Sequence, residues 1–156
     1  MRKMLKMFGC FVFLMAFVAC AAVSVNKGAV TYEKDVKKII ASRCLGCHGS
    51  GSPSIDEFKK DEAGFKKKKK GPIMNSYANL MVFVNGSDTG ALMRRLDDGK
   101  STKDGKPGNM YQDLGTTAEE RAANLAVIKN WVGGWTLKRK KDITEAELKA
   151  IKAVEK

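Results

Sequence analysis

The segment that most constrains the fold of this chain is Cys44-Leu45-Gly46-Cys47-His48. Two thiols separated by two residues can each add across a vinyl group of a porphyrin, which forms two thioether bonds. The histidine that follows Cys47 can then bind the iron through an imidazole nitrogen. The motif therefore predicts a covalently attached c-type haem, around which the rest of the chain has to pack.

Other uses of two cysteines and one histidine fit this sequence less well. A closed zinc site needs four cysteine or histidine ligands, but His48 is the only histidine, and Cys44 and Cys47 are the only thiols outside the expected leader, which contains Cys10 and Cys20. A redox-active pair of the thioredoxin kind needs a preceding strand and a βαβ context, whereas the residues before Cys44 have a helical pattern. A disulfide or redox pair is the remaining alternative to haem.

The N-terminus has the composition of an export signal. Three basic residues within the first six precede an uncharged run from Met7 to Ala19, as in the basic and apolar regions of a signal peptide. The run is too short for a membrane span, which needs about 20 apolar residues. We expect residues 1–20 to be a signal peptide, and the mature protein to be periplasmic or otherwise outside the cytoplasmic membrane.

The end of this leader fits two kinds of cleavage. Phe17-Val18-Ala19-Cys20 is similar to a bacterial lipoprotein signal, in which the cysteine is lipidated, although Phe17 stands where Leu is usual. Ala19-Cys20-Ala21 also fits the small-x-small pattern that the ordinary signal peptidase cuts. We prefer lipidation of Cys20, because it accounts for this cysteine and avoids an exposed thiol, and it would attach the protein to a membrane.

A helix is expected immediately before the cysteine motif. Thr31 can cap it, and it should run to about Arg43. Apolar residues at helical spacing form one face of this helix: Tyr32, Val36, Ile39 and Ile40. A helix that leads directly into such a motif resembles the entry to a class I bacterial cytochrome c. The resemblance implies a mainly α fold, a cytochrome c-like helical domain around one covalently bound haem c, with the N-terminal helix packed against the last helix.

The resemblance also implies a second iron ligand. In the family, this ligand is a methionine on a loop just before the final core helix. Here Gly108-Asn109-Met110-Tyr111 ends a polar loop, and Thr117 with Glu120 forms a capping box that opens a helix. Met110 is therefore the expected distal ligand, although Tyr111 stands where the family has proline after the methionine.

Three other methionines of the mature chain compete with Met110 for the distal position. Met81 and Met93 lie on apolar stripes of the helices expected over residues 76–84 and 89–96, where methionine more often fills the core. Met74 precedes the first of these helices and is the strongest rival. With no second histidine in the chain, ligation by two histidines of the same chain is excluded.

The mature chain, about 136 residues long, is enough for one domain with its own core. We divide it into a small, polar tether over residues 21–30, a cytochrome c domain over 31–135, and a C-terminal part over 136–156. This last part begins with basic residues, and we expect an extra amphipathic helix over 142–155. Thr144 and Glu147 form its capping box.

The chain is basic, with a formal net charge of +12, and Lys66 to Lys70 are five consecutive lysines. The simpler interpretation is a solvated loop that the repulsion between like charges keeps extended. The functional interpretation is a docking patch for redox partners with acidic surfaces, which suits transient electron transfer. Nucleic acid is an unsuitable partner, because the protein is exported and no aromatic residues alternate with these lysines.

These observations predict an exported monohaem c-type cytochrome that carries one electron at a time in a respiratory chain, and not an enzyme. One alternative is a haem enzyme or gas sensor whose distal site is open or labile. Another is a cytochrome subunit of a larger oxidoreductase complex, which would use the C-terminal helix as its attachment.

Overall fold

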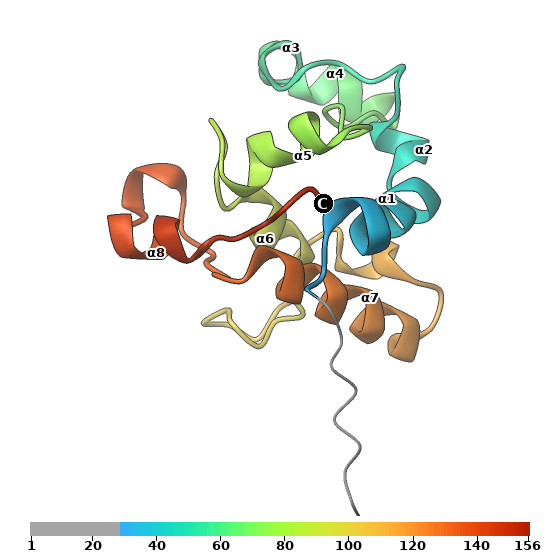
Figure 1. Ribbon diagram of the computed structural model, residues 1–156. Helices are drawn as coiled ribbons and strands as arrows, with labels where there is room; N and C mark the ends of the chain where they lie inside the picture. Colours follow the sequence, from blue (N-terminus) through green and yellow to red (C-terminus); the bar gives the residue numbers. More distant parts are fainter. Residues whose placement is uncertain (1–28) are drawn as a thin grey trace, which may run out of the picture.

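The computed structural model describes residues 29–156. The signal peptide, Cys20 and most of the tether therefore lie outside the described residues. In residues 29–156 the chain is helical and contains no β-strand, and one isolated antiparallel bridge joins Gly133 to Ile151. The prediction of a mainly α fold is confirmed (Figure 1). None of the helices described over this range is both long enough and apolar enough to cross a membrane.

The helices are short, except for one near the C-terminus. In chain order they are η1 (Tyr32–Val36), α1 (Lys37–Arg43), α2 (Leu45–His48), α3 (Ile55–Lys60), α4 (Glu62–Lys67), α5 (Tyr77–Val84), α6 (Ala91–Leu96), η2 (Tyr111–Leu114), α7 (Ala118–Val132), η3 (Lys140–Asp142) and α8 (Glu145–Ala150). The predicted helix over 89–96 begins two residues later, after a turn that ends at Gly90.

The N-terminal helix begins where the sequence predicts. The hydroxyl of Thr31 accepts a hydrogen bond from the Lys34 N–H at 3.4 Å, and the first turn, η1, is π-helical. All four residues of the predicted apolar face are buried: Tyr32, Val36, Ile39 and Ile40. The helix bends at Cys44, and α2 continues directly from it. The cysteine motif is thus held at the end of a well-packed helix.

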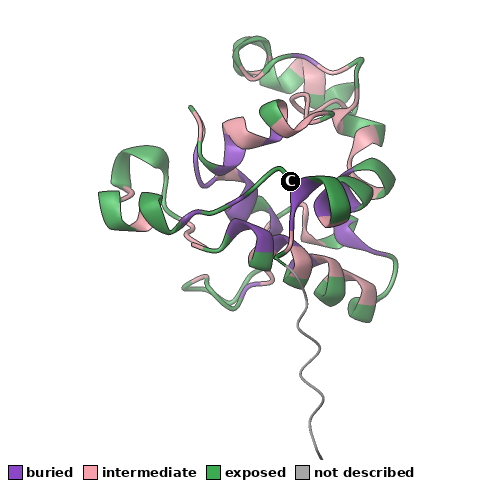
Figure 2. Cartoon of the chain, in the orientation of Figure 1, coloured by how far each residue is buried: buried purple, intermediate pink, exposed green. Residues whose placement is uncertain are grey.

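The core lies where η1 and α1 meet α5, α6 and α7 (Figure 2). Each of these helices contributes large apolar side chains, and burying one of them stabilises the fold by about 1.5–3 kcal/mol. The largest of the fully buried apolar side chains are Trp131, Leu80, Met93, Leu114 and Ile128. The N-terminal helix therefore packs against the last long helix, as the resemblance implied.

The extended loop expected over Lys66 to Lys70 is partly helical: Lys66 and Lys67 end α4, and Lys68 to Lys70 follow it outside any helix. The residues before and at the start of the lysine run, 55–67, are helical. They form α3 and α4, which lie together at one edge of the molecule (Figure 1). Ser54 and Glu57 form a reciprocal capping box on α3, and Asp61 caps α4 through the Gly64 N–H at 2.9 Å. Acidic first turns and basic last turns also suit the helix dipole. These local interactions outweigh the repulsion between the lysines.

The C-terminal part also differs from its prediction. The capping box of Thr144 and Glu147 is present, but α8 ends at Ala150. Residues 151–155, which we call the C-terminal strap, follow it without helical structure. Ile151 is buried in the core, whereas Leu148, on α8, is 37 % exposed. Part of the segment 136–156 thus completes the same core as residues 31–135.

The C-terminal strap is held by contacts with three other elements. The Val154 carbonyl accepts hydrogen bonds from the Tyr32 N–H at 3.0 Å and from the Trp131 indole N–H at 2.8 Å. The Tyr77 hydroxyl donates to the Ala153 carbonyl at 2.9 Å. These tertiary contacts compete successfully with continuation of α8, because the N–H of Tyr32 at the start of η1 would otherwise lack a partner.

At the start of α7, one of the two hydrogen bonds of the predicted capping box is present. Thr117 accepts from the Glu120 N–H at 3.1 Å, but the Glu120 carboxylate bonds Thr116 and Arg43 instead of the Thr117 N–H. The apolar residues at helical spacing along α7 form its buried face: Leu125, Ile128, Trp131 and Val132. Ala122, in the second turn, is exposed.

Candidate functional site

The two predicted attachment cysteines lie one helical turn apart. Cys44 ends α1 and is partly buried, while Cys47 lies in α2 and is exposed; both are free thiols. The Cys44 carbonyl accepts hydrogen bonds from the Cys47 N–H at 3.2 Å and from the His48 N–H at 2.9 Å. Residues three positions apart on a helix are surface neighbours, so both thiols can reach one planar group.

The environment of Cys44 connects the motif to the loop after Met110. Burial raises the pKa of the Cys44 thiol to about 11, and the negative charge of Asp113 contributes to this rise. The thiol is therefore protonated at neutral pH. Asp113 lies in η2, the element that begins directly after Met110, and η2 contacts α1. The segment after Met110 therefore lies beside the cysteine motif.

His48 is held in one tautomer by the backbone. Its Nδ1 atom lies 2.6 Å from the Pro72 carbonyl oxygen. A carbonyl can only accept, so Nδ1 must carry the proton and donate it, which leaves the lone pair on Nε2 for a metal. A hydrogen bond from the nitrogen that does not bind the metal orients a ligating imidazole and increases its basicity. His48 therefore has the arrangement of an iron ligand.

The segment 71–74 forms the support behind this imidazole. The Gly71 N–H donates to the Cys47 carbonyl at 2.8 Å, and the Met74 N–H donates to the His48 carbonyl at 2.9 Å. A Cβ atom at Gly71 would overlap the ring of His48. Only glycine allows the chain to pass so close to the imidazole, so the site requires glycine at position 71.

The residues present fit a covalently bound haem. Two thiols stand one turn apart, an imidazole follows with Nε2 directed to metal binding by its tautomer, and Gly71 with Pro72 keeps that imidazole in place. The sequence motif predicts the first three groups. It does not predict Pro72: the dipeptide Gly71-Pro72 signals a turn, but nothing local identifies His48 as its partner.

Met110 lies at the start of η2 and is partly buried against the core. Its N–H donates to the Arg95 carbonyl at 2.9 Å, which ties it to the end of α6. Its role as distal ligand stays a prediction. One rival, Met93, is fully buried among protein side chains. Another, Met74, donates its backbone N–H to the His48 carbonyl at 2.9 Å and is partly buried against the core.

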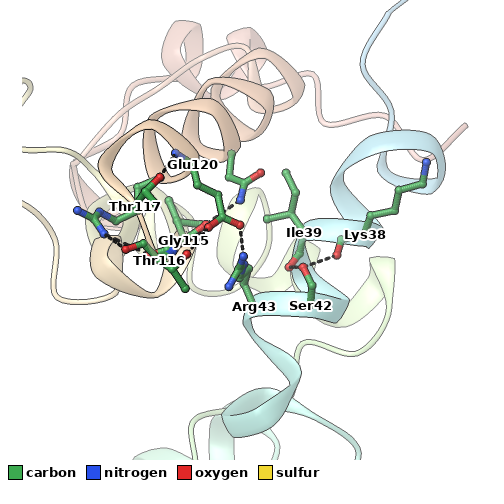
Figure 3. A network of polar contacts seen from close by, with 11 residues as sticks. Lys38, Ile39, Ser42, Arg43, Gly115, Thr116, Thr117 and Glu120 are labelled. Carbon is green, nitrogen blue, oxygen red and sulfur yellow. Dashed lines mark hydrogen bonds and ion pairs between the residues drawn. The ribbon is translucent and has the colours of Figure 1, made fainter.

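A polar network joins the cysteine motif to the loop after Met110 (Figure 3). Arg43, directly before Cys44, forms an ion pair with Glu120 of α7. The Glu120 carboxylate also accepts from the Thr116 N–H at 2.8 Å and from the Thr116 hydroxyl at 3.0 Å. The sequence alone did not predict this contact, because the two charged residues are 77 positions apart and Glu120 fits a local capping box.

Comparisons with known proteins agree with this site. The sequence model of the PccH cytochrome c family matches residues 31–154. Among solved structures, the monohaem cytochrome PccH from Geobacter sulfurreducens is similar in sequence and fold: the two chains are 52 % identical and have a TM-score of 0.76, and the match covers 81 % of this chain and 99 % of that chain. No curated protein matches the chain.

The family match spans the cysteine motif, the Met110 loop and most of the C-terminal strap. It confirms the predicted haem, and the zinc and disulfide alternatives are set aside. The chain belongs to the PccH cytochrome c family: it is a monohaem c-type cytochrome with one covalently bound haem c.

Proposed function

We propose that this protein is an exported one-electron carrier of a respiratory chain. In this proposal Cys44 and Cys47 attach the haem, His48 is the proximal iron ligand, and Met110 is the distal ligand. Membership of a monohaem cytochrome c family supports electron transfer. The observation that carries the assignment of the site is the 2.6 Å contact between His48 Nδ1 and the Pro72 carbonyl, because it prepares Nε2 of the residue next to Cys47 for a metal.

The bound haem supplies an iron that alternates between the ferric and ferrous states. The residues of the chain bind and orient it, and need not act as acids or bases. Pro72 keeps His48 in one tautomer, and thioether bonds through the sulfur atoms of Cys44 and Cys47 would fix the ring to the segment that joins α1 and α2. A histidine and methionine ligand pair favours a higher reduction potential than two histidines. Leu45, within the motif, and Tyr111, next to Met110, are partly buried against the core and would help to exclude water.

The assignment can be tested with absorption spectra of the exported protein in both oxidation states. We expect low-spin spectra, a far-red band from sulfur-to-iron charge transfer, haem retained after acid-acetone extraction, and slow binding of carbon monoxide. A high-spin ferric form that binds carbon monoxide or peroxide rapidly would contradict the electron-carrier proposal. It would favour a haem enzyme or sensor with an open distal site.

We further propose that the lysine segment, residues 66–70, docks acidic redox partners. Lys66 pairs with Glu62 at 2.6 Å, but no ion pair is formed within the described residues by Lys67 to Lys70. The segment runs directly into Gly71 and Pro72, which contact His48. An acidic partner bound here would therefore lie close to the proximal side of the site. Electrostatic attraction of this kind accelerates encounter without requiring a tight complex.

Charge reversal distinguishes this docking surface from general attraction to a basic protein. Replacing both Lys67 and Lys68 with glutamate should lower the second-order rate of electron transfer to an acidic redox protein and reduce its salt dependence. In the matched control, glutamate replaces Lys103 and Lys141, which are also exposed lysines outside the ion pairs of the described chain. This double variant changes the net charge by the same amount as the variant at Lys67 and Lys68. Equal loss of rate in both double variants would exclude a specific site at residues 66–70.

We also propose that Cys20 is lipidated and attaches the mature protein to a membrane from the periplasmic side. The sequence around Cys20 supports this proposal. Replacing Cys20 with serine should release the haem-containing protein into the soluble periplasmic fraction, and intact-mass measurement of the parent protein should show a diacylglyceryl modification. A parent protein that is soluble, unmodified and begins at Ala22, after the Ala19-Cys20-Ala21 pattern, would instead identify cleavage by the ordinary signal peptidase.

A further inference from the structure

Asp97 is a fully buried carboxylate that the proposed electron transfer does not use. It follows α6 directly, and its exposed fraction is 0 %. One oxygen, Oδ1, accepts hydrogen bonds from the Gly99 N–H at 2.8 Å and the Ser101 N–H at 3.2 Å. Its other oxygen, Oδ2, accepts from the Trp135 indole N–H at 2.8 Å. A buried charge is retained only where such partners compensate its lost hydration.

The backbone of Asp97 also binds the end of the loop that leads to Met110. The Gly108 N–H donates to the Asp97 carbonyl at 2.8 Å, and the Met110 N–H donates to the Arg95 carbonyl at 2.9 Å. A Cβ atom at Gly108 would overlap the carbonyl oxygens of Arg94 and Arg95, so the loop returns in direct contact with the end of α6. The side chain of Asp97 thus binds the start of the loop over residues 98–109, and its backbone binds the end.

Asp97 also connects this loop to the segment after α7. Trp135 donates to the carboxylate, and the ammonium group of Lys129 lies 3.9 Å from Oδ2 and 5.1 Å from the centre of the Trp135 ring. The cation compensates part of the buried charge and packs on the indole. Three separate segments, α6, the 98–109 loop and the end of α7, therefore meet at one carboxylate.

We propose that Asp97 is the positioning residue that holds Met110 in place for iron ligation. The inference rests on the proposed role of Met110 as distal ligand. A carboxylate is required because both of its oxygens accept, and three N–H groups point at it. An asparagine has a single acceptor oxygen, and its amide N–H₂ would face at least one N–H donor, which leaves buried polar groups unpaired. The loop would loosen, and the bond between the Met110 sulfur and iron would weaken.

The test measures how easily imidazole replaces the methionine in the haem-containing protein, followed by loss of the far-red band. For Asp97→Asn, we expect half-replacement at about a tenfold lower imidazole concentration, the change that corresponds to loss of one charge-assisted hydrogen bond. The matched control is Asp98→Asn. Asp98 is the next residue and also pairs with Lys129, at 3.3 Å. Its replacement removes the same charge and should leave the imidazole titration unchanged.

Trp135→Phe keeps the carboxylate and removes one donor, so it provides a second variant if Asp97→Asn does not fold. It should shift the titration in the same direction by about threefold. An unchanged titration in the folded variants, or an equal shift in Asp98→Asn, would overturn the role of Asp97. Met110→Ala separates the two proposals. If it removes the far-red band, the ligand assignment stands independently of Asp97, whereas a retained band overturns both.

Discussion

At the scale of single residues, the site depends on how closely the backbone approaches His48. The chain passes the imidazole at Gly71 with no space for a side chain, and the next residue, Pro72, supplies the carbonyl that fixes the tautomer. The orientation of the imidazole therefore depends on a glycine that has no side chain. In the proposed site, a change at Gly71 would act on the iron through the orientation of His48.

We expect Gly71→Ala to displace the His48 ring, because the added Cβ would overlap it. Overpacking of this kind costs about 1–3 kcal/mol. Thermal unfolding of the haem-containing protein should show this loss, together with a changed low-spin spectrum. Gly51→Ala is the control, since its Cβ would meet only the Lys70 ammonium group, at an ordinary 3.8 Å. Equal effects of the two substitutions would contradict the proposed contact.

The charge of Asp97 should also make stability depend on pH. Burial raises the pKa of its carboxyl, but the hydrogen bonds from Trp135, Ser101 and Gly99 together outweigh burial and lower it. A lowered folded-state pKa gives a contribution that is present above the ordinary aspartate value of about 4 and is lost as the pH falls through the folded value.

Asp97→Asn should therefore reduce the free energy of unfolding by about 1–3 kcal/mol near pH 6 and by less near pH 3, where less of the charge-dependent contribution is present. Urea unfolding of the haem-containing protein at both pH values measures this difference. A penalty of the same size at both values would show that the lost charge is not the cause.

At the scale of elements, α1 and α7 are joined beside the cysteine motif by the ion pair of Arg43 and Glu120. Both side chains are partly buried, with 28 % and 31 % of their surfaces exposed, and Thr116 gives the carboxylate two further donors. A pair that is partly shielded and supported by neighbouring hydrogen bonds should be stronger than an ordinary surface pair. It holds the end of α1 against the segment that follows η2.

A double-mutant cycle with Arg43→Ala and Glu120→Ala should give a coupling free energy of about 1 kcal/mol. The exposed pair of Glu33 and Lys37, separated by 2.8 Å within the N-terminal helix, is the matched control and should give a clearly smaller coupling free energy. Urea unfolding of the four proteins in each cycle provides the values. A coupling at positions 43 and 120 no larger than in the control would exclude a structural role for the network.

At the scale of the whole molecule, the C-terminal strap closes the fold. It places Ile151 and Ala153 in the core and bonds the backbone or side chains of Tyr32, Tyr77 and Trp131. These three aromatic side chains also pack together, with ring centres 5.5 Å and 6.2 Å from that of Tyr32. Elements from both ends of the described chain therefore depend on the last residues.

Removing residues 151–156 should lower the free energy of unfolding by at least about 3 kcal/mol, because buried apolar area and several backbone hydrogen bonds are lost together. Removing Lys156 alone is the control and should have no measurable effect, since this residue is exposed. Thermal and urea unfolding of the haem-containing proteins test the prediction. A shortened protein as stable as the parent would show that the C-terminal strap does not contribute to the stability of the fold.

Features that depend on short separations along the chain could be predicted from the amino-acid sequence. The spacing of Cys44, Cys47 and His48 was sufficient for the covalent haem, and local caps with apolar periodicity located the helix before the motif, α5 and most of α7. Even so, the caps at Ser54 and Asp61 were overlooked because the run of lysines suggested an extended loop. That signal was present in the sequence.

Only the tertiary structure decided which distant groups support these elements. Pro72 behind His48, Glu120 beside Arg43, Trp135 on Asp97 and the C-terminal strap along η1 all pair groups that are far apart in sequence. The physical reason is that a hydrogen bond within one turn is favoured by the connectivity of the chain, whereas a long-range partner is selected only when the whole core packs and brings the two groups together.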